Sequence, residues 1–154
     1  MLWRSIATLT AIDFCSLPAF ADEATKTQPI DGDDAVIEGD ASYFGDEFAG
    51  RKTVNGEHFN PEDLTAVSKK LPLGSQATLT DQETGKSVEV RINDRCPYVE
   101  GRVSDLSQVA ADRLEMVDDD TSPAWAEVDP DKQSNPEIHD RVEEMANGQK
   151  RKQQ

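Results

Sequence analysis

The chain has 154 residues, a length that allows one compact domain with additional terminal segments. It carries 31 acidic and 16 basic residues, which gives a formal net charge of −15. A protein that neutralises nucleic-acid phosphates needs the opposite sign, so we expect no nucleic-acid partner. The charge also disfavours anionic membrane surfaces, but it leaves a largely neutral sugar substrate open.

Residues 1–21 have the pattern of a cleavable export signal. Residues 5–17 are mostly apolar, and Ala19-Phe20-Ala21 places small residues where a signal peptidase reads them. A buried N-terminal helix is the alternative, but the apolar run is too short to span a bilayer and the sequence turns polar at Asp22. We therefore predict cleavage after Ala21, location in the periplasm or outside the cell, and no stable membrane anchor.

The two cysteines bear on anchoring and on disulfides. Cys15 lies inside the predicted signal, and the preceding Ile12-Asp13-Phe14 lacks the small residues that lipoprotein processing requires. Removal of the signal leaves Cys96 as the only thiol, so no intramolecular disulfide can form. Cys96 is then either a tolerated small residue or the site of an intermolecular disulfide.

The predicted folded unit spans residues 36–129. Residues 22–35 contain few large apolar groups and are expected to form a flexible lead. Residues 130–154 are rich in charge and contain two prolines, which predicts a disordered or weakly helical tail that contributes little to stability. The sequence shows neither an internal repeat nor a second domain.

Short strands separated by turns predict a small β-barrel within this unit. The clearest strand is 87–93, where Val88, Val90 and Ile92 alternate with polar residues. Gly85 suits the turn of a hairpin between this strand and an earlier one at 76–80.

One helix and a final strand follow. The helix is predicted from Ser107 to Met116, with Ser107 or Asp105 as its N-cap. Trp125, in the strand predicted at 122–128, either packs in the interior, which we favour, or lies in a sugar-binding cleft. Three small apolar residues share the strand's other face: Ala124, Ala126 and Val128.

Six short segments occur in a fixed order with characteristic gaps: Gly39 to Gly45, Gly50 to Phe59, Leu64 to Ala66, Leu71 to Leu73, Asn93 to Pro97 and Arg102 to Ser107. Together they resemble the RlpA-like family, and the resemblance covers about residues 39–128. That family has a double-psi β-barrel related to expansin and barwin domains, and some members are lytic transglycosylases that cleave peptidoglycan. The resemblance implies an all-β fold: a six-stranded double-psi β-barrel with one or two short helices.

The resemblance further implies that Asp94 is the catalytic residue. Cleavage of a glycosidic bond needs a proton for the leaving oxygen and a base that activates a nucleophile. In a lytic transglycosylase the nucleophile is the substrate's own C6 hydroxyl, so one carboxyl group can act first as acid and then as base. The alternative for Asp94 is to order the following turn by bonding backbone amides.

Two further positions bear on catalysis. Asp105 resembles an aspartate that expansins need for their action on walls, although a helix-cap role would also explain it. Ser68 stands where lytically active members of the family carry a histidine paired with the catalytic aspartate. A serine hydroxyl cannot carry a proton near neutral pH as imidazole does, so Ser68 argues against catalysis.

Four residues are candidates for substrate binding. Arg95 and Arg102 are expected either to orient Asp94 and lower its pKa or to form ordinary surface pairs. Tyr43 offers a flat face to a sugar ring, or belongs to the core. His58 either lies in the groove and compensates for the missing imidazole or faces solvent.

No cofactor or metal is expected. A single mature thiol with His58 and His139 supplies too few ligands for a metal cluster, and no phosphate-binding loop or dinucleotide fingerprint occurs. The sequence thus predicts a monomeric, exported enzyme that cleaves the MurNAc-GlcNAc strands of peptidoglycan to 1,6-anhydro-muramyl ends. The alternative is a non-catalytic, expansin-like module that binds or loosens the wall, and a third possibility is a secreted effector or inhibitor with a protein partner.

Overall fold

The computed structural model describes residues 34–95, 101–116 and 121–154. The predicted signal peptide, nearly all of the predicted lead and Cys96 lie outside the described residues. The strands are β1 (Ala35–Tyr43), β2 (Thr65–Val67), β3 (Gln76–Asp81), β4 (Ser87–Asp94), β5 (Arg102–Leu106) and β6 (Thr121–Val128). The α-helices are α1 (Gln108–Leu114) and α2 (Pro136–Lys152), and the 3-10 helices are η1 (Asp46–Phe48) and η2 (Pro130–Lys132). In the described part of the chain, none of these helices has the length and apolarity needed to cross a membrane.

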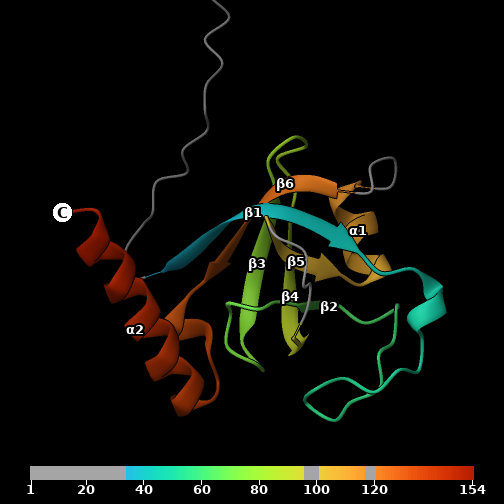
Figure 1. The fold of residues 1–154 in the computed structure, drawn as a ribbon, viewed down its shortest axis with the longest axis horizontal. Coiled ribbons are helices and arrows are strands. Elements are labelled where there is room, and N and C mark those ends of the chain that lie inside the picture. Colours follow the sequence, from blue (N-terminus) through green and yellow to red (C-terminus); the bar gives the residue numbers. More distant parts are fainter. Residues whose placement is uncertain (1–33, 96–100, 117–120) are drawn as a thin grey trace, which may run out of the picture.

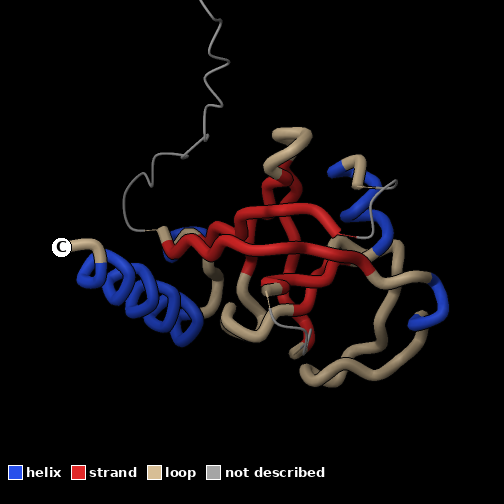
Figure 2. The backbone as a smooth tube through the Cα atoms, turned by 45° about the horizontal axis from the view of Figure 1, so that its top comes forward, coloured by secondary structure: helices blue, strands red, loops and turns tan. Residues whose placement is uncertain are grey.

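The six strands close into a barrel in the order β1-β5-β2-β4-β3-β6 (Figures 1 and 2). Two neighbouring pairs are parallel, β1 with β5 and β2 with β4, and the remaining pairs are antiparallel. The fold confirms the predicted six-stranded barrel, and the structure adds that its strand directions are mixed. Closure leaves the barrel with no unpaired outer strand.

Alternating side chains fill the barrel interior. Val88, Val90 and Ile92 of β4 are at most 5% exposed, as their spacing predicts. The predicted inward face of β6 is confirmed as well, because all three of its small apolar residues are buried. Other buried side chains in this core are Ala35, Ile37, Ala41, Ala66, Leu79, Val103 and Leu106. Burial of each larger aliphatic side chain stabilises the fold by about 1.5–3 kcal/mol.

Two glycines are required by the backbone. At Gly39 a Cβ atom would lie 2.5 Å from Cγ1 of Val103 and 2.8 Å from the carbonyl oxygen of Gly101. Any side chain there would therefore separate β1 from β5. Gly85, with φ of 71°, forms the predicted hairpin turn, and the Asp81 carboxylate supports it by accepting hydrogen bonds of 2.7 and 2.8 Å from the amides of Glu83 and Thr84.

Helix α1 is shorter than predicted and is capped differently. Ser107 occupies the N-cap position, but its hydroxyl makes no cap bond and accepts a 3.4 Å hydrogen bond from the amide of Thr65 instead. Asp105 is not a cap, because it lies within β5. Glu115 ends the helix with a left-handed backbone, φ 58°. Trp125 is not in the interior as favoured above, because it lies half-buried on the outer face of β6.

The C-terminal segment differs most from the prediction. Residues 136–152 form the longest helix, which packs beside the first half of β1 (Figure 1). Val142 and Ala146 are at most 1% exposed and join the main core, so the prediction of a tail that contributes little to stability is wrong. Asn135 caps the helix by accepting a 2.9 Å bond from the amide of Glu137.

Two glutamine side chains fasten this segment to the barrel. Gln149 accepts a 3.0 Å bond from the amide of Val36 and donates a 2.7 Å bond to its carbonyl. Gln133 repeats the arrangement at Gln76, with bonds of 2.9 and 3.0 Å. Each glutamine side chain thus makes the two backbone hydrogen bonds that a neighbouring strand would otherwise make, with β1 at Val36 and with β3 at Gln76.

Candidate active site

Asp94 lies half-buried at the end of β4, where it contacts the long connection from β1 to β2. Its Oδ1 accepts hydrogen bonds from two backbone amides, that of Val54 at 3.1 Å and that of Arg95 at 2.8 Å. Oδ2 accepts none from the residues that the structure describes. Among the described residues, the carboxylate is therefore held through one oxygen alone.

The connection that supplies the amide of Val54 is itself fixed to the barrel. Its residues 50–59 fold back through a bridge between Lys52 and His58, with the turn at Asn55-Gly56. Glu57 and Arg91 form a two-pronged ion pair, with both N–O distances 2.8 Å. The hydrogen bonds of Arg91 hold the pKa of the Glu57 carboxyl below its ordinary value.

This connection also presents an apolar surface beside Asp94. The Val54 side chain is 64% exposed, a large fraction for an aliphatic residue. In the same connection, the ring of Phe44 contacts those of Phe48 and Phe59, with centroids 5.0 and 5.9 Å apart. The aromatic ring of Phe44 thus supports the connection. Val54 is thus an exposed apolar residue whose backbone amide contacts Asp94.

Asp105 lies on the other side of β2 from Asp94. Val67 of β2 pairs with Asp94 on one side and Asp105 on the other, which separates their Cα atoms by about 10 Å, two strand spacings. Asp105 is 3% exposed. Its Oδ1 accepts a hydrogen bond from the hydroxyl of Ser42 and forms an ion pair with Nη2 of Arg102 at 2.9 Å. These contacts make Asp105 a buried structural group.

Ser68 is next to Asp94 through the backbone but not through its side chain. The amide of Ser68 donates to the carbonyl of Asp94 at 3.3 Å. The hydroxyl, in a residue only 1% exposed, donates to the carbonyl of Val103 at 3.0 Å and accepts from the amides of Lys70 and Leu71 at 3.4 Å each. This hydroxyl therefore stabilises a turn and is not accessible to substrate.

Neither predicted arginine pairs with the Asp94 carboxylate. Arg102 binds Asp105, as described above. Nη1 of Arg95 donates to the carbonyl of Ser68 at 2.9 Å and to that of Leu71. Burial, and then the nearby charge of Arg141, lower the pKa of Arg95. Neither guanidinium hydrogen-bonds to the Asp94 carboxylate, although the charge of Asp94 partly opposes the lowering of the Arg95 pKa.

The last two predicted binding residues lie at the edges of this site. Tyr43, at the end of β1, is half-buried and packs against the core, in agreement with its core alternative. His58 is exposed, and its Nδ1 donates to the carbonyl of Gly50 at 2.9 Å. His58 thus belongs to the same connection as Val54, and the structure shows no contact between its imidazole and Asp94.

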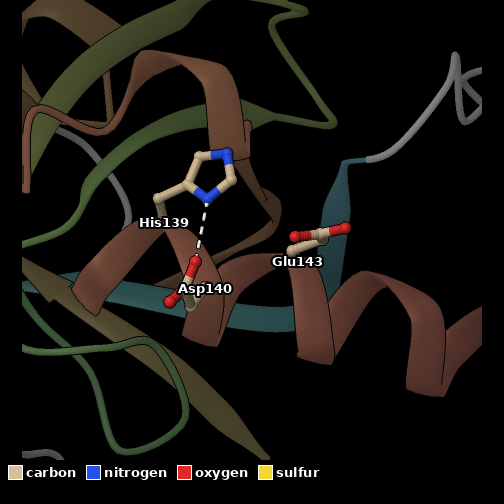
Figure 3. A group of neighbouring side chains, drawn as sticks. All are labelled: His139, Asp140 and Glu143. Carbon is tan, nitrogen blue, oxygen red and sulfur yellow. Dashed lines mark hydrogen bonds and ion pairs between the residues drawn. The ribbon is translucent and has the colours of Figure 1, made fainter. Parts of the chain in front are cut away.

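One group of side chains that could bind a cation was missed. His139, Asp140 and Glu143 on α2 hold ligand atoms within 4.8 Å of one another (Figure 3). The sequence analysis counted only thiols and imidazoles. His139 Nδ1 is 3.4 Å from Asp140 Oδ1, and both carboxylate residues are exposed. Solvated side chains of this kind are common on a helix surface, so we assign the group no role.

The sequence analysis also missed Val54, Glu57 and Arg91. The Asn55-Gly56 dipeptide is a turn signal that places Val54 and Glu57 on the two arms of a tight bend. What the sequence could not indicate is that this bend lies over the end of β4, since residues 54 and 94 are brought together only by closure of the barrel.

The closed six-stranded barrel with two parallel strand pairs is the architecture of the double-psi β-barrel domains. Residues 36–124 match the sequence model of the family described as lytic transglycolase. The chain belongs to this family.

Curated relatives match the same part of the chain. A protein of Nostoc sp. named as a probable endolytic peptidoglycan transglycosylase RlpA is 48% identical over 94 residues, which are 60% of this chain and 25% of the relative. The endolytic peptidoglycan transglycosylase RlpA of Campylobacter jejuni is 41% identical over 93 residues, 60% of this chain and 34% of the relative. The chain thus spans a quarter to a third of the length of these relatives.

A solved structure supports the fold. It is an expansin variant of Clavibacter michiganensis in complex with cellohexaose, with a TM-score of 0.50 and 16% sequence identity. The match covers 65% of this chain and 53% of the expansin chain. At this identity the likeness concerns the fold alone.

Proposed function

We propose that this chain is an exported lytic transglycosylase that cleaves MurNAc-GlcNAc strands of peptidoglycan and leaves 1,6-anhydro-muramyl ends. The observation that supports it most is the Asp94 carboxylate, with one oxygen held by two amides and the other bonded to none of the described residues. Protonated Asp94 gives its proton to the glycosidic oxygen as the C1–O bond breaks. The resulting carboxylate then accepts the proton of the C6 hydroxyl as O6 bonds to C1, which restores the acid.

The state of Asp105 favours this non-hydrolytic route over hydrolysis. Most glycoside hydrolases use two carboxyl groups, one as acid and one as nucleophile or base for water. In this chain Asp105 is buried and bonded to Ser42 and Arg102, so it cannot reach a sugar without breaking an ion pair. A reaction in which one carboxyl group acts twice, on a nucleophile that the substrate itself carries, needs only Asp94.

One observation favours a second function, expansin-like binding of wall glycan without cleavage. The position next to Asp94 carries Ser68, whose hydroxyl is buried in backbone bonds, and the imidazole of His58 bonds to Gly50. No second proton carrier therefore contacts Asp94 among the described residues. Such a site binds glycan through the same surface but transfers protons poorly.

The products of the reaction distinguish the two functions. Purified protein is incubated with peptidoglycan, and the soluble fragments are weighed by mass spectrometry. Transglycosylation gives anhydro-muramyl ends that are one water lighter than hydrolytic ends. Asp94→Asn is the control, because it keeps the acceptor of both backbone amides and removes the acid. Protein that binds the glycan but releases no anhydro product supports the expansin-like function and contradicts the enzyme.

Export is part of the proposal and has its own test. It is supported by the apolar run at 5–17, the small residues around Ala21 and the polar residues that follow. Mass spectrometry of the exported fraction should find an N-terminus at Asp22 and no lipid on the protein. A cytoplasmic chain that retains Met1 would contradict export while leaving the chemistry of Asp94 untouched.

A further inference from the structure

The C-terminal helix α2 runs along the connection from β2 to β3, residues 68–75. A Cβ atom at Gly74 would lie 3.1 Å from Cδ1 of Ile138, so the first turn of the helix touches one end of this connection. Nearer its other end, Lys70 lines the same open groove as Met145 of α2. The part of α2 between Ile138 and Met145 therefore faces the connection.

Arg141 lies on this same side of α2. It follows Ile138 by three residues and precedes Met145 by four, and residues at these spacings share one face of a helix. The side chain is exposed, and it forms neither a hydrogen bond nor an ion pair with any described residue. Contacts within the described part of the chain therefore give no reason for an arginine at this position.

Arg95 reaches the same connection from the end of β4. Its Nη1 donates to the carbonyls of Ser68 and Leu71, and its other two guanidinium nitrogens donate to none of the described residues. Burial, and then the charge of Arg141, lower the pKa of Arg95. Two guanidinium groups therefore lie near each other at the connection, one from the barrel and one from α2.

This pair of cations is next to the candidate catalytic carboxylate. The carbonyl of Asp94 accepts a 3.3 Å hydrogen bond from the amide of Ser68, and the carbonyl of Ser68 accepts the bond from Arg95. The charge of Asp94 also opposes the lowering of the Arg95 pKa, so the carboxylate and the guanidinium act on each other. A substrate bound at Asp94 therefore meets the positive charge of the pair.

The charge of the pair suits an anionic group of the substrate. The whole chain has a formal charge of −15, yet neither arginine forms an ion pair with the described residues. Guanidinium groups bind carboxylates through pairs of parallel hydrogen bonds. MurNAc, the sugar whose C1–O bond breaks in the proposed reaction, carries a lactyl ether that ends in a carboxyl group. The substrate thus has a carboxyl group on the same ring as the scissile bond.

We propose that Arg95 and Arg141 form a cationic subsite beside Asp94 that binds the carboxylate of muramic acid. The subsite distinguishes the muramic acid ring from the uncharged GlcNAc ring, and so decides which sugar of the strand lies at Asp94. Arg141 lies outside residues 36–124, which match the family, so the subsite depends on a segment beyond the family domain. The proposal deepens the proposed function, on which it rests for the identity of the substrate.

Binding of matched saccharides tests the subsite without any cleavage. The disaccharide GlcNAc-MurNAc contains no MurNAc-GlcNAc bond and so is not cut. It is titrated into the full chain with its carboxyl group intact or reduced to an alcohol. Binding is followed by NMR chemical shifts, with the amides of Val54 and Arg95 as reporters of the Asp94 site. Wild type should bind the carboxylate form more tightly than the alcohol form.

Arg141→Gln should reduce this preference by roughly two- to fivefold, the range of an exposed ion pair, and leave binding of the alcohol form unchanged. Arg141 is varied and not Arg95, because Arg95 also holds the connection. The variant should keep the wild-type melting temperature, since the side chain is exposed. Arg151→Gln is the matched control: it removes a guanidinium ten residues later on the same helix, about 15 Å along its axis, and should change neither affinity.

Three results would overturn the proposal. The first is that wild type does not bind the carboxylate form at millimolar concentration, or binds both forms equally. The second is that the preference survives in Arg141→Gln. The third concerns the free stem peptide, which offers carboxylates without the sugar: the proposal fails if Arg141→Gln weakens binding of the peptide and not that of the disaccharide. Absence of anhydro products from glycan strands would reject the enzyme alone, because the titration does not depend on cleavage.

Discussion

Asp94 and Asp105 flank the same residue of β2, yet their surroundings are opposite. Asp94 ends its strand, is half-buried and touches two backbone amides through a single oxygen. Asp105 lies inside its strand, is 3% exposed and is neutralised by Arg102. Each aspartate thus lies one strand spacing from Val67. Asp94 can meet a substrate, whereas Asp105 holds β1 and β5 together.

This difference follows from where each residue stands in its strand. A side chain at the end of a strand is flanked by a loop, which supplies amide donors and leaves an approach for ligands. A carboxylate within a closed barrel has neighbours on both sides and requires a cation and a donor to be tolerated. Two residues of the same type therefore separate into a chemical and a structural role, and substitutions at four positions test that separation.

The largest effect is expected at Asp94. Asp94→Asn keeps the amide contacts but removes the proton carrier, so the rate of anhydro product formation should fall by roughly 10²- to 10⁴-fold. Glycan binding and the free energy of unfolding should change little. Rate and binding measured on the same preparation provide the check. A rate loss matched by a loss of binding would mean that Asp94 holds the glycan and does not transfer protons.

Asp105 should show the reverse pattern. Asp105→Ala leaves the guanidinium of Arg102 without its partner in a largely buried place, and it removes the acceptor of Ser42. We expect a loss of about 2–4 kcal/mol in the free energy of unfolding, measured with urea. Asp105→Asn should cost less, because an amide oxygen can still accept both hydrogen bonds. Unchanged stability with lost activity would assign Asp105 to the reaction.

Substitution of Ser68 should affect stability more than rate, as expected for Asp105 and unlike Asp94. Ser68→Ala removes the hydroxyl that bonds Val103 and the turn at residues 70–71. The cost should be about 1–2 kcal/mol of stability, with no change in rate per folded molecule. Ser68→His is the complementary variant. If the missing imidazole limits the reaction, it should raise the rate, despite the strain of placing a larger side chain at a position that is 1% exposed.

The barrel was predictable because its signals are local. Alternation at Val88, Val90 and Ile92, the turn at Gly85 and the resemblance of the segments around Asp94 all indicated the observed strands, and these are confirmed. The partners of individual side chains were not predictable. Arg102 bonds Asp105 and not Asp94 because the register of β5 decides which carboxylate it meets.

The C-terminal helix shows a different limit of sequence patterns. Its apolar face consists of a few residues among many charges, which is typical of a tail that cannot fold alone. Two features without a sequence signal hold this helix on the barrel. Gln133 and Gln149 hydrogen-bond to the backbone of strands β3 and β1. Val142 and Ala146 cover one side of the core. Helices of this kind are stabilised by tertiary contacts and not by intrinsic propensity.

The smallest expected effect concerns the connection that positions Asp94. Glu57→Gln weakens the ion pair with Arg91, which holds the arm next to Val54. The pKa of Glu57 is lowered in the folded state, so its stabilising contribution is complete above the ordinary value of 4.5 and is lost as the pH falls through the depressed value. Both side chains are more than a third exposed, so we expect less than about 1 kcal/mol at neutral pH.

The measurement is the difference in unfolding free energy between wild type and Glu57→Gln across a pH series. The difference should be constant above the ordinary carboxyl pKa of 4.5 and should vanish as the pH falls below the depressed pKa of Glu57. Glu62→Gln is the control for loss of a charge, since the side chain of Glu62 forms no ion pair with the described residues. The rate of anhydro product formation is measured for both proteins over the same pH series. If the rate of Glu57→Gln falls below that of wild type at the pH values where the stability difference is present, the connection positions Asp94 through Val54. A normal rate with the stability difference intact would confine Glu57 to structure, as with Asp105.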